Sequence, residues 1–559
     1  MRNSMSPAAI ALSTASRYFD RLRRRARLFF RGESPRRFFD LHDARLVREV
    51  FTDAGHPPPA EPAPGAFERG ERIYELHGDV RALFPFALTP FGRAAFLHWY
   101  IVYGRGELAA SPDDLVAYLA ELDATPDRGL VPTYLLRPDW QEQHPDALTP
   151  HGWGAFKRWL ADEYGVTGRW FRRASLPPRY GQEQMPGPGV NLVGFFRYTS
   201  GLQQAVQSVA NALSLAGINT ELRDVPNSHA RETRRREGFD GLERHPVTIL
   251  NTGLDLSVPE VYKLAALHPK RDTYRVAVWW WELERLPADW LGRGADVDEI
   301  WAPTTFIATA LKPLGKPIYP MLPSVRLPEF TPRPKEYFGL DRAKFTFLFV
   351  FDMNSRMPRK NPLALIRAFR RAFAPADPVE LVVKVSPQEK FFPEWWSELR
   401  SAAAENGVRL IDKHVSRDDL YALMNAADAY VSLHRSEGLG LTMAEAMLLG
   451  KPTIATGYSG NLDIMTPSNS YLVKYERTTI AEATWPYPQG CEWAEPSVEH
   501  AAELMRDVFD HPEEAKAVGR RGRDEVTALL SPDVAGRRMA ARLNEIAAGG
   551  FQHHRGRTT

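Results

Sequence analysis

The chain has 559 residues, more than a single hydrophobic core usually supports, so three or four packed units are expected. Hydrophobic residues make up 44% and charged residues 25%, which excludes a chain that is disordered or fibrous as a whole. The formal net charge of +2 is uneven, because residues 1–40 hold ten arginines against three acidic residues. The rest is slightly acidic, which argues against a nucleic-acid surface over the whole protein.

The cysteine content and the length of the apolar runs indicate the cellular compartment. Cys491 is the single cysteine, so it excludes an intrachain disulfide and a cysteine-based zinc cluster and favours a reducing compartment. No uninterrupted apolar run reaches ~18 residues, and the run at 8–12 is too short for a signal peptide. We therefore expect a cytoplasmic protein that is either free or peripheral at the inner face of a membrane.

The first 65 residues form a basic tail with a proline-rich linker. Residues 17–37 mix arginines with leucine and phenylalanine, which fits either a basic interfacial helix on anionic lipid or a solvated tail. Residues 57–64 contain five prolines and separate this tail from folded structure.

A repeated motif follows. The sequence Ala-Leu-Thr-Pro at 87–90 recurs at 147–150, and each copy continues with a phenylalanine and a tryptophan three residues apart. Thr-Pro is typical of a helix start, with threonine as the N-cap and proline at the first helical position. We expect a small helical domain over residues 66–185, built from two related units.

From residue 189 strands and helices alternate, which predicts parallel sheets covered by helices. A proline cluster at 323–334 divides this region into two series, which we assign to domains at 186–335 and 336–525. Residues 526–559 are expected to form a C-terminal helix that returns toward the N-terminal domain, followed by a tail. Two doubly wound domains in tandem place a ligand-binding cleft between them. The predicted strands are 190–196, 247–250, 275–279, 298–302, 345–351, 380–385, 408–410 and 429–433, and the predicted helices include 202–216, 362–373 and 417–426.

The sharpest motif is the segment 436–447, which follows a buried strand and begins a helix. Gly438 and Gly440 let the backbone approach a ligand closely, and the helix start offers free N–H groups to a phosphate. Glu437 precedes the helix and has no structural reason to be acidic. Glu445 has one, because Thr442-x-x-Glu445 also fits a capping box.

The spacing of Glu437 and Glu445, the preceding helix that ends at 427–429, and the later segment 457–461 together resemble family 4 glycosyltransferases of the GT-B fold. The resemblance covers about residues 189–546. It implies a retaining hexosyltransferase in which Glu437 contacts the donor sugar and Glu445 holds the ribose. The amides around Gly438, Leu439 and Gly440 would meet sugar and phosphate. Bacterial surface polysaccharide synthesis is the usual setting of such relatives.

Cations between a strand and a helix, at 356–362, mark the expected diphosphate site. Lys360 matches the lysine that family members place here, and Arg356 or Arg359 would substitute for their arginine. Cations near a helix start oppose the macrodipole, so an anionic ligand explains them better than structure does. Because no Asp-x-Asp motif is evident in the expected cleft, we expect neither a metal nor a cofactor.

The acceptor side is expected in the first domain. Gly201 begins a helix after the strand at 190–196 and can admit donor phosphates or acceptor. The run Trp279-Trp280-Trp281 cannot face one core with all three rings, so at least one indole is expected in the cleft. Glu282 is our candidate for the acceptor-side contact.

The sequence thus predicts an α/β protein of the GT-B class, with a helical repeat domain in front. It would move a sugar from a nucleotide diphosphate sugar to a glycan or lipid-linked acceptor. An epimerase or phosphorylase of the same fold, or a non-catalytic sugar-binding module, stays open. Glycoside hydrolysis is less compatible, because it needs two carboxylates ~5 to 10 Å apart across one bond. The catalytic candidates are Glu437, Lys360, Arg356 and Glu282, and the binding candidates are Glu445, Gly438, Leu439, Gly440, Gly201 and Arg359.

Overall fold

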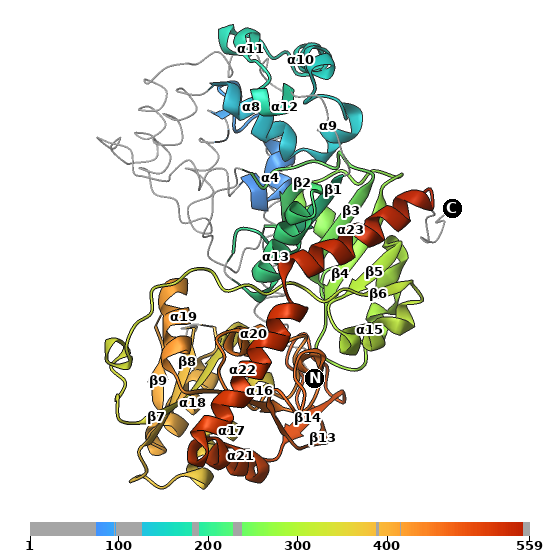
Figure 1. Cartoon of the computed structure of the whole chain (residues 1–559). Coiled ribbons are helices and arrows are strands. Elements are labelled where there is room, and N and C mark those ends of the chain that lie inside the picture. Colours follow the sequence, from blue (N-terminus) through green and yellow to red (C-terminus); the bar gives the residue numbers. More distant parts are fainter. Residues whose placement is uncertain are drawn as a thin grey trace, which may run out of the picture. The chain divides into compact units, whose positions relative to one another are not determined.

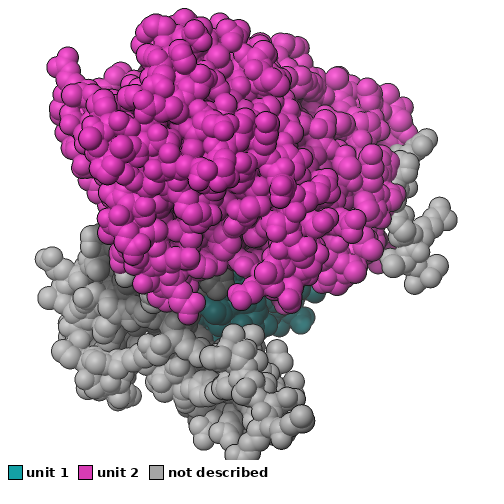
Figure 2. All heavy atoms as spheres, turned by 90° about the horizontal axis from the view of Figure 1, so that it is seen from below, with its two compact units in different colours: residues 1–185, 266–268 teal, residues 186–265, 269–559 magenta. Residues whose placement is uncertain are grey.

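The structure is a computed structural model, and its described residues fall into two compact units (Figure 2). The first lies within residues 1–185 with 266–268, and the second comprises 186–265 and 269–559. The basic tail, the proline-rich linker and Trp99 lie outside the described residues. No helix in the described part of the chain is long and apolar enough to cross a membrane. The structure describes residues 74–93, 96, 126–181, 189–198, 200–226, 238–386, 391–413 and 415–551.

Helices make up the described part of the first unit. Its second repeat copy begins a helix as predicted, because Thr149 caps α10 and accepts a hydrogen bond from the Gly152 N–H at 3.0 Å. Both copies share one turn, in which the threonine hydroxyl donates to the carbonyl three residues earlier, at 2.9 Å for Thr89 and 2.8 Å for Thr149. The helices are α4 (Gly78–Leu83), α8 (Pro126–Leu135), α9 (Pro138–Gln143), α10 (Pro150–Tyr164), α11 (Arg169–Arg173) and α12 (Pro178–Gly181).

The glycine of each repeat copy has a packing reason. A Cβ at Gly92 would lie 2.6 Å from the Phe86 backbone, and one at Gly152 would lie 1.8 Å from the Asp146 carbonyl oxygen. Any side chain here would push the turn away from the helix start. Phe86, directly before the first copy, packs on Trp140 of α9 and on Tyr164 at the end of α10, with ring centroids 5.3 and 5.1 Å apart.

The second unit contains two parallel sheets (Figure 1). The first has the order β2-β1-β3-β4-β5-β6, and all neighbouring pairs are parallel. Its strands are β1 (Gly189–Gly194), β2 (Asn219–Asp224), β3 (Val247–Gly253), β4 (Tyr274–Trp280), β5 (Glu299–Ala302) and β6 (Ile318–Pro320). Its helices include α13 (Gly201–Leu215), α14 (Val258–Ala265) and α15 (Thr305–Leu311).

The other sheet has the order β12-β11-β10-β7-β8-β9, again with parallel neighbours. Its strand β7 is a nearly continuous apolar run, because helices cover both faces of such a sheet. Two six-stranded parallel sheets with helices confirm the predicted GT-B class. The strands are β7 (Phe345–Phe351), β8 (Val379–Val385), β9 (Arg409–Ile411), β10 (Ala429–Ser432), β11 (Thr453–Thr456) and β12 (Tyr471–Val473). The helices are α16 (Met357–Lys360), α17 (Pro362–Ala372), α18 (Pro393–Glu405), α19 (Arg417–Ala426), α20 (Leu441–Leu448), α21 (Val498–Asp510) and α22 (Pro512–Leu529).

The strand order of each sheet reverses at one place. The reversal lies between β1 and β3 in the first sheet and between β7 and β10 in the second. Loops on the carboxyl side of two such strands diverge and leave room for a ligand, so doubly wound sheets bind ligands there. The loop after β7 carries the predicted cations, and the loop after β10 carries Glu437.

Two elements extend this plan. An antiparallel hairpin, β13 (Tyr475–Thr479) and β14 (Glu492–Pro496), follows β12. The last helix, α23 (Pro532–Ala548), packs along α13 of the first sheet (Figure 1). A Cβ at Gly536 would lie 2.4 Å from the Ala212 carbonyl oxygen, so glycine permits the close approach of the two helices.

Candidate active site

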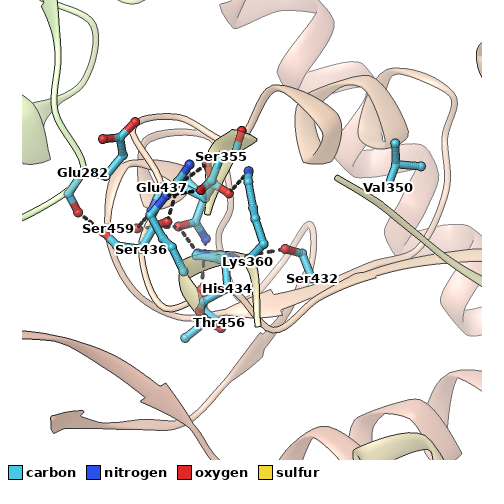
Figure 3. Close-up of polar contacts among 12 residues, drawn as sticks. Glu282, Val350, Ser355, Lys360, Ser432, His434, Ser436, Glu437, Thr456 and Ser459 are labelled. Atoms are coloured by element: carbon cyan, nitrogen blue, oxygen red, sulfur yellow. Dashed lines mark hydrogen bonds and ion pairs between the residues drawn. The ribbon is translucent and has the colours of Figure 1, made fainter. Parts of the chain in front are cut away.

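Glu437 forms the centre of a charged cluster at the reversal point of the second sheet. Figure 3 shows Lys360 and Glu437 pointing toward one another, and the Lys360 ammonium donates to Oε1 of the carboxylate. Nη1 of Arg359 lies 3.1 Å from Oε2 of the same carboxylate and donates to the Ser436 carbonyl oxygen at 2.8 Å. The structure thus brings together three predicted site residues, two from the short helix α16 and one from the loop after β10.

The cluster is almost closed to solvent, and its charges set the protonation states. Glu437 is 7% exposed. Burial acts to raise the pKa of Glu437, but the positive charges of Lys360 and Arg359 outweigh it and hold the pKa at about 2. Burial also lowers the pKa of Lys360, against the attraction of the carboxylate. Glu437 is therefore a carboxylate at any physiological pH.

The backbone around Glu437 is fixed by the loop after β11. The Glu437 N–H donates to the Ser459 hydroxyl at 2.8 Å, and its carbonyl accepts from the Gly460 N–H at 3.0 Å. Ser459 has a φ of 79°, and Arg356 and Asn361 in the loop after β7 have φ of 69° and 54°. Non-glycine residues seldom adopt such angles, and strained positions of this kind concentrate at functional sites.

Glu445 lies inside α20 and does not cap it. The N-cap residue of this helix is Gly440, with a φ of 84°, and no side chain makes a capping hydrogen bond. Thr442 is therefore not the N-cap, and the capping-box alternative for Glu445 is wrong. The carboxylate is 4% exposed and accepts a hydrogen bond from the Tyr421 hydroxyl at 2.9 Å. Burial raises the pKa of Glu445 to about 7. Leu439, in the loop before the helix, is buried.

Arg356 lies apart from this cluster. Its Nε donates to the Trp485 carbonyl, and its guanidinium carbon lies 5.5 Å from the ring centroid of Phe392 and 5.9 Å from that of Trp485. Of the two candidate arginines, Arg359 is the one beside Glu437.

The carboxyl edge of the first sheet meets this cluster. Trp279 and Trp281 are buried, whereas Trp280 lies against the loop, with a ring carbon 3.1 Å from where a Gly438 Cβ would be. The Thr304 hydroxyl donates to the Gly438 carbonyl at 2.9 Å.

Two further predicted residues lie at this meeting edge. The Ser436 hydroxyl donates to the backbone carbonyl of Glu282. A Cβ at Gly201, where α13 begins, would lie 3.9 Å from Leu441, where α20 begins. The starts of these two helices therefore oppose each other across the site.

Two residues of the site have no counterpart among the sequence candidates. His434 is wholly buried, with ring nitrogens 3.3 Å from the Ser432 hydroxyl and 3.2 Å from the Asn461 side-chain oxygen, and burial lowers its pKa. Its position two residues after the end of β10 was an available signal. Tyr487 comes from the loop between β13 and β14 and donates to Oε2 of Glu282 at 3.0 Å. No sequence pattern pointed to it.

The arrangement suits an anionic ligand with a hydroxyl-rich part. Lys360 and Arg359 can balance phosphate charge, and free N–H groups at the start of α20 add to this. A carboxylate that is ionised and held in place accepts hydrogen bonds from sugar hydroxyls. Among the described residues, no group of three or more His, Cys, Asp or Glu is arranged to hold a metal.

Comparison with known proteins finds similarity to a sequence family over the second sheet. Residues 344–484 match the family model described as glycosyl transferases group 1. The GDP-mannose-dependent monoacylated alpha-(1-6)-phosphatidylinositol monomannoside mannosyltransferase of Corynebacterium glutamicum is 27% identical over 237 residues, which cover 40% of this chain and 55% of the relative. Trehalose synthase of Rubrobacter xylanophilus is 26% identical over 202 residues, 35% of this chain and 42% of the relative. The similarity therefore spans about half the length of these relatives.

Similar solved structures include sucrose-phosphate synthase from Thermosynechococcus elongatus, with a TM-score of 0.49 and 14% identity over 65% of this chain and 100% of that one. Another is Anabaena Alr3699/HepE in complex with UDP and glucose, with a TM-score of 0.47 and 12% identity over 64% and 100% of the two chains. The family match contains Arg359, Lys360, Glu437 and Glu445. The part of the chain that holds this charged cluster is therefore similar to glycosyl transferases of group 1.

Proposed function

We propose that the chain is a glycosyltransferase that moves a sugar from a nucleotide diphosphate sugar to a glycan or lipid-linked acceptor. The observation that carries the proposal is the buried Glu437 carboxylate held between Lys360 and Arg359, at the reversal point of the second sheet. The family match of residues 344–484 and the printed activity of the Corynebacterium relative support this class of reaction.

In this proposal each group has a part. The donor diphosphate lies against Lys360, Arg359 and the start of α20, and the two cations offset the charge that develops on the leaving group. As the phosphates draw the cations toward them, the oxygens of Glu437 become available to the sugar hydroxyls. Glu445 accepts hydrogen bonds from the ribose, and Glu282 faces the acceptor.

Finer features of the proposal rest on the family 4 resemblance. They are retention of the anomeric configuration, catalysis without a metal, and a role in bacterial surface polysaccharide synthesis. The departing phosphate oxygen would take the proton of the acceptor hydroxyl. A cytoplasmic location, with peripheral contact between residues 17–37 and anionic membrane, also belongs to the proposal.

A donor panel tests the proposed function. UDP- and GDP-sugars are screened for protection of the protein against thermal unfolding. A ligand present at a concentration ~100 times its dissociation constant stabilises the folded state by about 2.7 kcal/mol. We expect one donor class to raise the unfolding temperature of the wild type and to lose this effect in Glu445→Gln.

Product analysis separates the transferase from its alternatives. With the protecting donor, free nucleotide diphosphate and a new glycoside should appear together when a sugar acceptor is added. Formation of an epimerised donor without acceptor would instead identify an epimerase. Absence of protection by every donor would contradict the proposal.

A further inference from the structure

The hairpin β13–β14 links the two sheets of the second unit. On one side, Nε of Arg435 lies 2.6 Å from Oε2 of Glu495, and the Ala494 N–H donates to the Arg435 carbonyl at 3.0 Å. On the other side, both guanidinium Nη atoms of Arg477 donate to Glu284 at 2.8 Å. Arg435 follows β10 and Glu284 follows β4, so the hairpin is anchored at both carboxyl edges.

These anchors place one residue of the hairpin loop inside the candidate active site. Tyr487 is 4% exposed, and its backbone forms a mutual pair with Thr484, at 2.7 and 3.0 Å. Its ring centroid lies 5.8 Å from that of Trp281 and 5.8 Å from the guanidinium carbon of Arg359. The family match ends at residue 484, so Tyr487 lies beyond the segment shared with group 1 glycosyl transferases.

The contact that Tyr487 makes is specific. Its hydroxyl donates to Oε2 of Glu282 at 3.0 Å, and the Ser436 hydroxyl holds the Glu282 backbone carbonyl. In the described part of the chain no other hydrogen bond and no ion pair reaches that carboxylate. Oε2 is thus held by the phenol, and Oε1 accepts no hydrogen bond from the described residues.

We propose that Tyr487 is a positioning residue that holds Oε2 of Glu282, so that Oε1 meets a hydroxyl of a sugar acceptor. The inference rests on the proposed transferase function and deepens it by naming the group that orients the acceptor side. A phenol suits this task because its O–H donates one directional hydrogen bond and carries no charge to neutralise the carboxylate. The hairpin thereby becomes part of acceptor recognition, beyond the donor-binding loops.

Kinetics with a matched control test the role. Tyr487→Phe removes one hydroxyl from the site, and Tyr274→Phe removes a comparable one from the first sheet, where Tyr274 donates to the buried Glu299 at 2.9 Å. The probes are octyl glucoside and octyl mannoside as acceptors, with the donor that protects against heat. We expect Tyr487→Phe to lower kcat/KM for the acceptor about tenfold with unchanged donor protection. Tyr274→Phe should lower the unfolding temperature without changing transfer.

A double-mutant cycle separates positioning from a general structural effect. If Tyr487 acts through Glu282, Tyr487→Phe should have no further effect in a Glu282→Gln background, whereas independent effects would add. Additive losses, or unchanged acceptor kinetics in Tyr487→Phe, would overturn the inference.

A spectroscopic arm keeps the inference separate from the proposed function. Burial and the negative charge of Glu282 raise the pKa of Tyr487 well above its ordinary value. With tyrosines labelled by ¹³C at Cζ, and Tyr487 assigned from Tyr487→Phe, Glu282→Gln should shift the Cζ resonance of Tyr487 at neutral pH, because its hydroxyl then no longer donates to a carboxylate. An unchanged resonance would overturn the pairing. If the wild type transfers no sugar but Glu282→Gln still shifts the Tyr487 resonance, the proposed transferase function would be contradicted. The Tyr487–Glu282 contact would stand.

Discussion

Glu437 divides its two carboxylate oxygens between Lys360 and Arg359, so each positive charge already has a partner before any ligand binds. Such buried pairs pay a large desolvation cost, and removing one partner leaves an uncompensated charge. A diphosphate offers the same cations a stronger counter-charge. In the proposed function both cations would therefore keep an anionic partner when the donor enters, and the Glu437 carboxylate would accept hydrogen bonds from the sugar hydroxyls in their place.

Lys360→Ala tests the contribution of one cation. If Lys360 offsets charge on the leaving diphosphate, as proposed, kcat should fall by on the order of 10² or more. Near-ultraviolet circular dichroism would check that the fold persists. Lys516→Ala, at an exposed lysine of α22, is the control and should retain wild-type turnover. Near-normal turnover of Lys360→Ala would refute the assignment.

Glu445 should give the stability of the protein a distinctive pH dependence. Its pKa is raised from 4.5 to about 7, so the folded state holds the proton more tightly than the unfolded chain does. This contribution is present below the unfolded value and is lost as the pH rises through about 7. Between about pH 5.5 and pH 8, the free energy of unfolding should fall by about 2 kcal/mol more in the wild type than in Glu445→Gln.

Urea titrations at both pH values measure this difference. Glu513→Gln, at an exposed glutamate, serves as the control and should follow the wild type. An equal pH dependence in wild type and Glu445→Gln would show that the carboxyl is not held protonated by burial.

Sequence reasoning brought together part of the candidate cluster, and its limit is physical. The contact between Glu437 and Lys360 was predictable because each lies in the segment that follows a strand whose end is evident in the sequence. The sequence could not show which of Arg356 and Arg359 lies beside Glu437, because the two arginines are close in sequence but their side chains point in different directions. The Trp485 carbonyl that accepts from Arg356 is distant in sequence. Tyr487 depends on the hairpin anchors, which no local pattern reveals.

At the scale of elements, buried parallel strands were the most predictable. The prediction for β7 matches its observed bounds, because an apolar run covered on both faces has clear ends. Strand β2, with the sequence Asn219–Asp224, was missed because it lies at the sheet edge and half of its residues are polar and partly exposed. The hairpin β13–β14 was missed for the same reason, since β13 is mostly exposed.

The attachment of α23 to the first sheet depends on one buried carboxylate. Glu299 on β5 is wholly buried, and Arg542 on α23 lies 2.6 Å from its Oε2. Because Arg542→Ala would leave Glu299 without a cation, we expect the free energy of unfolding to fall by about 3 to 5 kcal/mol. Urea denaturation measures it, and Arg538→Ala, at an exposed position of the same helix, should change it by about 0.5 kcal/mol at most. Equal effects of the two substitutions would contradict the role of this pair.

At the scale of the whole molecule, the two sheets bring their carboxyl edges together around Glu437, with positive charge supplied by side chains. If Lys360 and Arg359 supply the charge that a divalent ion supplies elsewhere, transfer should continue in excess EDTA at the wild-type rate. Lys360→Ala gives the comparison, because added Mg²⁺ should not restore its activity. A strict requirement for Mg²⁺ or Mn²⁺ in the wild type would contradict this mechanism.

The return of α23 to the first sheet has a consequence for synthesis of the chain. The apolar face formed by β1, β3 and α13 is completed by side chains of residues 535–546, more than 300 positions later than β1. A nascent chain therefore exposes part of this face on the ribosome until α23 has emerged, while the second sheet can already fold. Ribosomes stalled before residue 532 should hold a first sheet that is open to protease, and those stalled well beyond residue 548 a protected one.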